Sequence, residues 1–259
     1  MLLNLNADLG ESFGPWPMGD DARLLNVVNS ANIACGFHAG DPLVMSTTID
    51  ASKRAGVSIG AHPGFPDLQG FGRRSMVLPD GELRAMIQYQ LAALDGLGRC
   101  AGLPMTHVKP HGALNNMACE DRHLADVIVA AVKHYDPDLI FLAPALSQLA
   151  AAAEDSSLPL ALEVFADRAY TASGSLVSRL KPGAVLETAS ACITHVQAMI
   201  DADGIVTQSG EILPTPFHSI CVHGDTAHAV DTARQIRAAL LNQGHQLLGL
   251  PVLMARRSS

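Results

Sequence analysis

Aromatic side chains and positive charge are both scarce in this sequence. Aromatic residues make up 4% of the 259 residues, so the apolar volume of the core must come from aliphatic side chains. The formal net charge is −8, with 17 basic residues against 25 acidic ones. No basic stripe is present that would attract nucleic acid or anionic lipid. We therefore expect neither a nucleic acid nor a membrane as a partner.

Membrane-spanning segments and disulfide signals are missing as well. No apolar run approaches the roughly 18 residues that suggest a membrane helix. The first residues lack the positive flank of a signal peptide and reach Asp8 too early for one. The five cysteines are scattered and contain no C-x-x-C pair, which argues against a disulfide framework or a zinc ribbon. We expect a cytoplasmic protein with reduced cysteines.

The signatures of several enzyme classes are also absent. The chain has no P-loop, no G-x-S-x-G elbow, no H-E-x-x-H motif and no strand-linked G-x-G-x-x-G. These absences remove serine hydrolases, zincins and Rossmann dehydrogenases from the first choices. An ATP site in this chain would not be a P-loop.

Short apolar runs alternate with longer segments of helical period. Hydrophobic residues form 48% of the chain and charged residues 16%, a balance typical of a folded globular protein. The alternation favours βα units with parallel strands. About seven such strands suit an open doubly wound sheet or a closed barrel, and both place function at the carboxyl ends of strands. The candidate strands cover 2–7, 31–35, 57–61, 105–109, 138–142, 160–164 and 219–223.

Helix signals lie between these strands. Apolar residues at spacings of three and four predict helices over 83–97 and 124–135. Asp41 and Pro42 predict an N-cap and a first helical turn, and Gly56 marks the other end of the same helix.

Two segments with weak periodicity are expected to form long loops. Residues 165–183 and 204–217 are rich in Gly, Pro, Ser and Thr, and loops of this length are often lids or binding loops. Nothing indicates a second domain, so we expect a single α/β domain over 1–250. Residues 251–259 show no clear element and are expected to form a C-terminal tail.

Four histidines occur in one repeated setting. His38, His62, His111 and His223 each follow an apolar strand, and a glycine follows each at once or one residue later. In a parallel α/β fold they would converge at one rim, where glycine permits close approach of the backbone to a ligand. A single histidine of this kind is more often bonded to a loop carbonyl. Four together indicate a functional pocket.

Acidic side chains are expected at the same rim. Asp8 and Glu11 come with the first strand, and Glu163 and Asp167 with the sixth. Each carboxylate can act as a general base, a metal ligand or an anchor for a substrate ammonium. Bracing of a loop through backbone N–H groups explains Glu11 and Asp167 equally well.

Basic side chains complete the set. Lys109 ends an apolar strand, where a lone ammonium is costly without a partner or an anionic ligand. Arg73, Arg74 and Arg168 can clamp a carboxylate or a phosphate through bidentate contacts. Adjacent arginines are equally often a solvated pair. A divalent metal bound by histidine and aspartate from separate strands is compatible with the sequence, which leaves the metal undecided.

Six segments together resemble one known family. They are LNADLGESFG, SANIACGFHAGDP, IGAHPGFPDLQGFGRR, HVKPHGAL, EVFADRAY and CVHGD, in this order. Over nearly the whole chain this pattern resembles the LamB/YcsF family, whose members are also called the A subunit of 5-oxoprolinase. The resemblance implies a seven-stranded irregular β/α barrel similar to the glycoside hydrolase/deacetylase barrels.

The resemblance also implies an activity, namely the ATP-dependent opening of the lactam 5-oxo-L-proline to L-glutamate together with the B and C subunits. A lactam is stabilised by resonance, and phosphorylation of its oxygen would weaken that resonance. The resemblance leaves open whether ATP binds this chain or the partner subunits. The catalytic candidates are Asp8, His38, His62, Lys109, His111 and His223. The substrate-binding candidates are Glu11, Arg73, Arg74, Glu163, Asp167 and Arg168.

Within this hypothesis, Lys109 and the arginines of GFGRR stabilise developing charge on phosphate or on the substrate carboxylate. Asp8 or a rim histidine activates water, and another histidine protonates the departing nitrogen. Two alternatives remain. The chain is a metal-dependent deacetylase of an N-acyl sugar, which analogy of fold supports only weakly. Or it is a non-catalytic subunit that binds 5-oxoproline and presents it to its partners.

Overall fold

The computed structural model describes residues 1–222 and 229–257, and a closed β-barrel forms its centre. Seven parallel strands pair in the order β1-β2-β3-β4-β5-β6-β9, and β9 pairs back with β1. The seven predicted strands are thus confirmed, and the barrel rather than the open sheet is the correct alternative. The strands are β1 Leu2–Leu9, β2 Ser30–Ala34, β3 Ser58–His62, β4 Met105–Val108, β5 Ile140–Pro144, β6 Leu160–Phe165 and β9 Ser219–Cys221.

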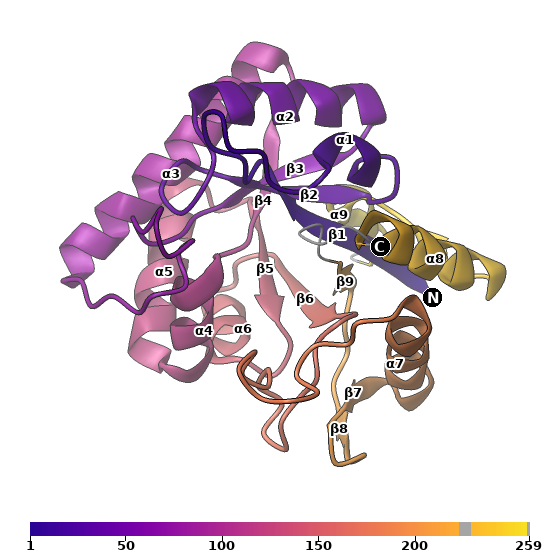
Figure 1. Cartoon of the computed structure of the whole chain (residues 1–259). Coiled ribbons are helices and arrows are strands. Elements are labelled where there is room, and N and C mark those ends of the chain that lie inside the picture. Colours follow the sequence, from indigo (N-terminus) through magenta and orange to yellow (C-terminus); the bar gives the residue numbers. More distant parts are fainter. Residues whose placement is uncertain (223–228, 258–259) are drawn as a thin grey trace.

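Helices surround the barrel, where the chain crosses from one strand to the next (Figure 1). The predicted helices over 83–97 and 124–135 are confirmed within α3 and α5, whose apolar faces are buried. The helices are α1 Asp21–Leu24, α2 Pro42–Ala55, α3 Asp80–Ala101, α4 Gly112–Glu120, α5 Arg122–Tyr135, α6 Gln148–Asp155, α7 Ala189–Ala202, α8 Ala229–Asn242 and α9 Leu250–Arg257.

Helix α2 begins and ends at the predicted residues. The Asp41 carboxylate accepts hydrogen bonds from the backbone N–H groups of Leu43 and Val44, at 2.8 and 3.0 Å. Pro42 occupies the first helical position, and Gly56 terminates the helix in the left-handed conformation with φ of 68°. Local capping chemistry alone therefore sets both ends of this helix.

The barrel interior is polar because β1 alternates apolar and polar side chains. Leu5 belongs to the main hydrophobic core, whereas Asn4 and Asn6 bond to serine side chains on the neighbouring strands β2 and β9. Asn4 donates to Ser30 Oγ at 2.9 Å and accepts from Ser219 Oγ at 2.6 Å. Asn6 donates to Ser219 Oγ at 2.7 Å. These buried polar groups are therefore satisfied by one another rather than by water.

The predicted C-terminal tail is wrong in its structure, because Leu250–Arg257 form helix α9. Leu250 is fully buried and packs with Ile140 and Ala161, which lie at the starts of β5 and β6. Its backbone N–H donates to Ser30 Oγ at the start of β2. Helix α9 thus covers the end of the barrel where the strands begin. The short strand β10, Gln246–Leu247, leads into it and pairs with the start of β1.

The two predicted loops differ in structure. Residues 204–217 contain an antiparallel hairpin of β7, Gly204–Val206, and β8, Ile212–Pro214, so the expectation of a loop without strands is wrong there. Residues 165–183 are mostly turns, with isolated bridges from Arg168 to Val185 and from Tyr170 to Leu176. In the described part of the chain no helix combines the length and the apolar character needed to cross a membrane.

Candidate active site

A cavity of about 650 Å³ opens where the barrel strands end. One part of its wall comes from the strand ends and the turns that follow, another from α4, and a third from residues 174–180 of the long loop. The Tyr170 hydroxyl fastens this loop to the barrel by accepting a hydrogen bond from the N–H of Phe165 at 2.8 Å. The loop therefore forms part of the cavity wall. The polar residues from the strand ends are Asp8, Glu11, His62, Lys109 and His111.

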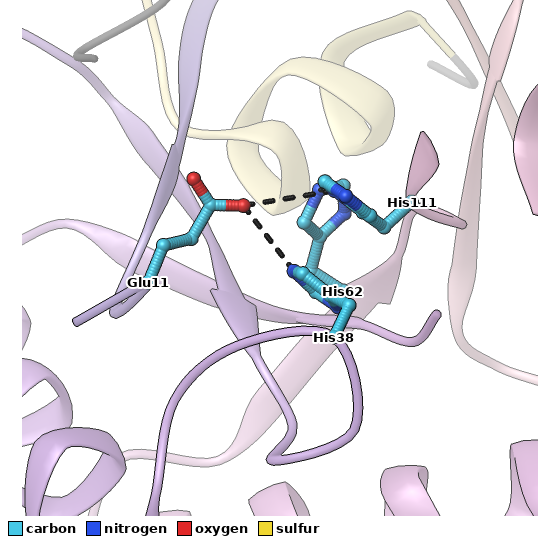
Figure 2. Close-up of side chains that lie close together, drawn as sticks. All are labelled: Glu11, His38, His62 and His111. Atoms are coloured by element: carbon cyan, nitrogen blue, oxygen red, sulfur yellow. Dashed lines mark hydrogen bonds and ion pairs between the residues drawn. The ribbon is translucent and has the colours of Figure 1, made fainter. Parts of the chain in front are cut away.

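Three histidines and Glu11 gather at this end of the barrel. His38 follows β2, His62 is the last residue of β3, and His111 precedes α4. Glu11 and the three rings each offer one ligand atom, and these four atoms lie within 4.8 Å of one another (Figure 2). The rings of His38 and His111 stack with centroids 3.6 Å apart. The predicted convergence of these histidines is confirmed, while His223 lies outside the described residues.

Two glycines make this close packing of rings possible. A Cβ at Gly72 would lie 2.7 Å from His38 Cβ and 2.9 Å from His111 Cδ2, and the φ of Gly72 is +63°. A Cβ at Gly64 would lie 2.7 Å from His38 Nδ1. Any side chain at either position would displace a histidine, so the ring cluster requires the glycines of AHPG and GFGRR.

The stacked histidines are held in the neutral form. Burial, together with nearby His62, lowers the pKa of His38 well below its usual value. Burial, together with His38 and His62, does the same to the pKa of His111. A neutral imidazole keeps a lone pair that can accept a proton or bind a cation.

Lys109 lies inside the barrel between two carboxylates. Its Nζ is 3.1 Å from Asp8 Oδ1 and 3.0 Å from Glu163 Oε1. Burial opposes the ammonium form, but Asp8 and Glu163 outweigh it and raise the pKa of Lys109 well above its usual value. Lys109 is therefore a fixed positive charge in the cavity wall. The sequence predicted that an ammonium at this apolar strand end would need a partner, and these two carboxylates are its partners.

Glu163 and Cys221 support Lys109 from within the barrel. Burial raises the pKa of Glu163, and Lys109 offsets this only in part. The Cys221 Sγ lies 3.2 Å from Lys109 Nζ. Burial nevertheless raises the pKa of this thiol well above its usual value, so Cys221 does not supply a thiolate near neutral pH. Neither side chain is among the described residues that line the cavity.

Arg168 lines the cavity with part of its guanidinium unused. Its Nη2 donates to Val177 O at 2.7 Å, whereas its Nε is buried with no hydrogen-bond partner in the described part of the chain. Burial and nearby Arg179 lower the pKa of Arg168. Arg73 and Arg179 also line the cavity. An unused buried donor among positive charges is the chemistry that binds a carboxylate or a phosphate.

Arg74 and Asp167 do not share this position. The Arg74 guanidinium pairs with Asp67, and its side chain is 63% exposed. Of the two adjacent arginines only Arg73 lines the cavity among the described residues. Asp167 is outside the described cavity wall as well, and its backbone oxygen accepts the N–H of Leu186 at 2.8 Å.

Sequence reasoning missed the polar network beneath the cavity and the wall formed by α4. Asn32 donates to Asn6 Oδ1 and to Asp8 Oδ1, each at 2.8 Å. The ring of His107 reaches Asn32 Oδ1 through Nε2 at 3.1 Å. The alternation of Asn4, Asn6 and Asp8 along the first strand is the signal that could have revealed an inward polar face.

A family comparison agrees with this architecture. Residues 3–254 match the LamB/YcsF family. The chain belongs to the LamB/YcsF family. A member from Azoarcus sp. (strain BH72), named as the A subunit of 5-oxoprolinase, is 57% identical over 251 residues, which cover 97% of this chain and 98% of the relative. The crystal structure of a lactam utilization protein from Thermus thermophilus matches with a TM-score of 0.91 and 38% identity, covering 96% of this chain and 100% of that one.

The family barrel also resembles deacetylase barrels. The catalytic domain of a peptidoglycan N-acetylglucosamine deacetylase from Eubacterium rectale ATCC 33656 matches with a TM-score of 0.51 and 11% identity, covering 96% of this chain and 88% of that one. At this identity the likeness concerns the fold alone. The predicted relation between this barrel and the deacetylase barrels is confirmed at that level.

Proposed function

We propose that this chain is the A subunit of a 5-oxoprolinase, which couples the hydrolysis of 5-oxo-L-proline to L-glutamate with that of ATP, together with the partner B and C subunits. The observation that carries the proposal is the 57% identity, over 97% of the chain, to a 5-oxoprolinase A subunit. The likeness to a lactam utilization protein at a TM-score of 0.91 supports the same substrate class.

The cavity has the chemistry that 5-oxoproline needs. The substrate carries one carboxylate, and we assign its binding to Arg168 with help from Arg73. The buried, unpartnered Nε of Arg168 supports this assignment, because an anionic ligand would satisfy it. The lactam carbonyl would then face Lys109, His62 and His111, which line the same cavity.

ATP would activate the lactam before water attacks. The lactam oxygen displaces ADP from the γ-phosphorus, and water then adds to the ring carbon. The carbon–nitrogen bond breaks as the nitrogen takes up a proton, which leaves γ-glutamyl phosphate. A second water releases phosphate and L-glutamate, so each turnover consumes one ATP and two water molecules. Binding of ATP by the partner subunits is in keeping with the absence of a P-loop in this chain.

We assign the charge and proton steps to Lys109 and Asp8, which line the same cavity as Arg168. Lys109 stabilises negative charge that develops on the lactam oxygen. Asp8 lines the cavity, and its carboxylate can take a proton from water and deliver it to the departing nitrogen. His38, His62, His111 and Glu11 form the cluster beside it, whereas no role is assigned to His223.

Glutamate release from 5-oxoproline tests the function. The chain alone, and then with purified candidate B and C subunits, is assayed with and without ATP. We expect turnover only with all three subunits plus ATP, and we expect Arg168→Met to raise KM more than it lowers kcat. Arg122→Met is the matched control, since Arg122 pairs with Asp126 and Asp155 on the surface. No turnover from an assembled complex would refute the proposal.

A second candidate is favoured by the cluster of Glu11 and three histidines, which has the donors of a metal-dependent deacetylase. Acetate release from N-acetylated sugars by the chain alone distinguishes this activity from the first, since it needs neither ATP nor partners.

A non-catalytic, substrate-presenting role predicts a third pattern. The complex would turn over normally with Lys109→Met, while substitution of Arg168 would still weaken binding of 5-oxoproline.

A further inference from the structure

The hydrogen bonds of His62 and His111 determine which ring nitrogen carries a proton. His62 Nδ1 lies 2.6 Å from the backbone oxygen of Lys109, and His111 Nε2 lies 2.9 Å from that of Phe71. A carbonyl oxygen only accepts hydrogen bonds, so both of these nitrogens donate. The remaining nitrogens, His62 Nε2 and His111 Nδ1, therefore carry lone pairs in the neutral rings.

These two lone pairs face each other. His62 Nε2 and His111 Nδ1 are 2.9 Å apart, and neutral rings in these tautomers have no proton to place between them. The contact is repulsive unless a proton or a metal ion joins the two nitrogens, and the Asp8 carboxylate, with Oδ2 3.3 Å from His62 Nε2, favours a positive charge there. Glu11 Oε1 is 3.6 Å from His111 Nδ1 and 3.2 Å from His38 Nε2 (Figure 2). A carboxylate and a third imidazole thus point toward the same place.

The spacing of these atoms suits a small metal ion. Bonds of about 2.0–2.1 Å in a tetrahedral zinc site place neighbouring ligand atoms about 3.3 Å apart. The three ligand-atom separations of 2.9, 3.2 and 3.6 Å lie around that value. All four ligand atoms lie within 4.8 Å of one another. Small movements of the longer pairs would complete the shell. Imidazole donors favour zinc and its neighbours in the first transition series over magnesium or calcium.

We propose that Glu11, His38, His62 and His111 bind one divalent transition-metal ion, with Zn²⁺ the expected occupant. The backbone oxygens that accept from His62 and His111 orient these rings, as outer hydrogen bonds do for metal-binding histidines. Glu11, His62 and His111 line the cavity, so the ion would be within reach of a bound carbonyl and would polarise it. The metal site stands apart from the proposed function. Metal binding does not depend on that function. A role of the ion in opening the lactam does depend on it.

Metal binding by the full-length chain, purified without a histidine tag, tests the site. After loading with Zn²⁺ and removal of excess metal, we expect one ion per chain by elemental analysis. Competition with a chromophoric chelator should show a larger loss of affinity for His62→Gln and for His111→Gln than the 10- to 100-fold that outer partners typically contribute. His123→Gln is the matched control, because His123 is exposed and pairs with Asp80. Its affinity for zinc should equal that of the parent chain.

Two results would overturn the proposal. One is a folded chain that retains no Zn²⁺, Mn²⁺ or Fe²⁺ after loading. The other is zinc affinity unchanged in both His62→Gln and His111→Gln, since a proton rather than an ion would then join the two rings. Circular dichroism checks that the variants fold, and Glu11→Gln and His38→Gln provide a second pair. Zinc binding without oxoprolinase turnover in the assembled complex would retain the site and refute the function, whereas turnover by metal-free protein would support the function and refute only a role of the ion in opening the lactam.

Discussion

At the scale of single residues, Lys109 holds two buried carboxylates together. Its ammonium lies about equally far from Asp8 and Glu163, at 3.1 and 3.0 Å. Removal of the ammonium would leave two acids facing each other in a space with little water. The cost of breaking such a buried arrangement is typically about 3–5 kcal/mol. Lys109 is thus required for the stability of the barrel as well as for charge in the cavity.

Substitution Lys109→Met should therefore abolish turnover and also lower the melting temperature. Adding Glu163→Gln to this variant removes one of the opposed carboxylates, and the glutamine oxygen can still accept from Asn6. We expect the double variant to regain part of the lost melting temperature but no activity. Thermal unfolding and the coupled glutamate assay measure the two effects separately.

Lys53→Met is the control for this pair of variants. Lys53 is exposed, and its ammonium donates to the backbone oxygen of Ala101 on the outside of the barrel, so both properties should stay at the parent values. A fully active Lys109→Met would contradict the assignment of this ammonium to the reaction.

At the scale of elements, strands β3 and β4 fit together because Gly60 leaves room for His107. A Cβ at Gly60 would lie 2.2 Å from His107 Cδ2. The ring fills the space that a side chain on β3 would need, and it reaches Asn32 across β3. The glycine in the predicted strand at 57–61 is therefore a packing requirement of the neighbouring strand.

We expect Gly60→Ala to lower the free energy of unfolding by about 1–3 kcal/mol, the usual cost of overpacking. The loss should be smaller when His107 is also replaced by alanine, because the two positions are in contact. Gly96→Ala is the control, since a Cβ there meets no atom within 4 Å and alanine favours the helix α3. Urea denaturation of Gly60→Ala, His107→Ala, the double variant and Gly96→Ala measures the coupling between positions 60 and 107. Equal losses in both backgrounds would show that the ring is not the obstacle.

Helix α9 offers a second comparison at this scale. Leu253 is fully buried, and its neighbour Val252 is 49% exposed. Leu253→Ala should reduce the free energy of unfolding by about 2–5 kcal/mol, as leucine truncations in cores do. Val252→Ala should change it far less. Chemical denaturation distinguishes a helix that is part of the core from a dispensable tail, for which both substitutions would be silent.

At the scale of the whole molecule, buried histidines make stability depend on pH. Burial lowers the pKa of His107 to about 3 and that of His218 to about 4. The unfolded chain takes up these protons near pH 6.5, whereas the folded chain resists them. This contribution to stability is complete above pH 6.5 and is lost as the pH falls toward 4 and then 3. Each of these histidines contributes a slope of about 1.4 kcal/mol per pH unit within its window.

Denaturation at several pH values between 7 and 5 should therefore give a steadily falling free energy of unfolding. His38 and His111, whose pKa values are also lowered, act in the same direction. His107→Gln should flatten the slope, because glutamine does not titrate. A slope that is the same with and without His107 would mean that this ring is protonated in the folded chain.

Local signals made much of the fold predictable. Apolar runs located the barrel strands, and the capping chemistry of Asp41 and Gly56 gave both ends of α2. The repeated histidine-glycine pattern indicated the rim, since parallel strands bring their carboxyl ends together. Three of the four histidines meet there in the described structure.

Features that depend on distant partners were not predictable. Barrel closure requires the pairing of β9 with β1, which no local pattern encodes. The sequence PVLMARRSS has little helical periodicity, and its helix exists because Leu250 finds an apolar site beneath the barrel. The position of Arg74 beside Asp67 depends on a turn, whereas Arg73 one residue earlier lines the cavity. Sequence adjacency could not separate these two arginines.

The pairing of β1 has a consequence for how the chain acquires its structure. Asn4 is bonded to Ser219 and to Leu248, partners that lie 215 and 244 residues away along the chain. Contacts between residues so far apart along the chain form late and slow folding. During synthesis the first strand leaves the ribosome long before β9, β10 and α9 exist, and its edge stays unpaired until then. Completion of the barrel therefore waits for residues 219–257, and until they are present the open edge of β1 can pair with strands of other chains.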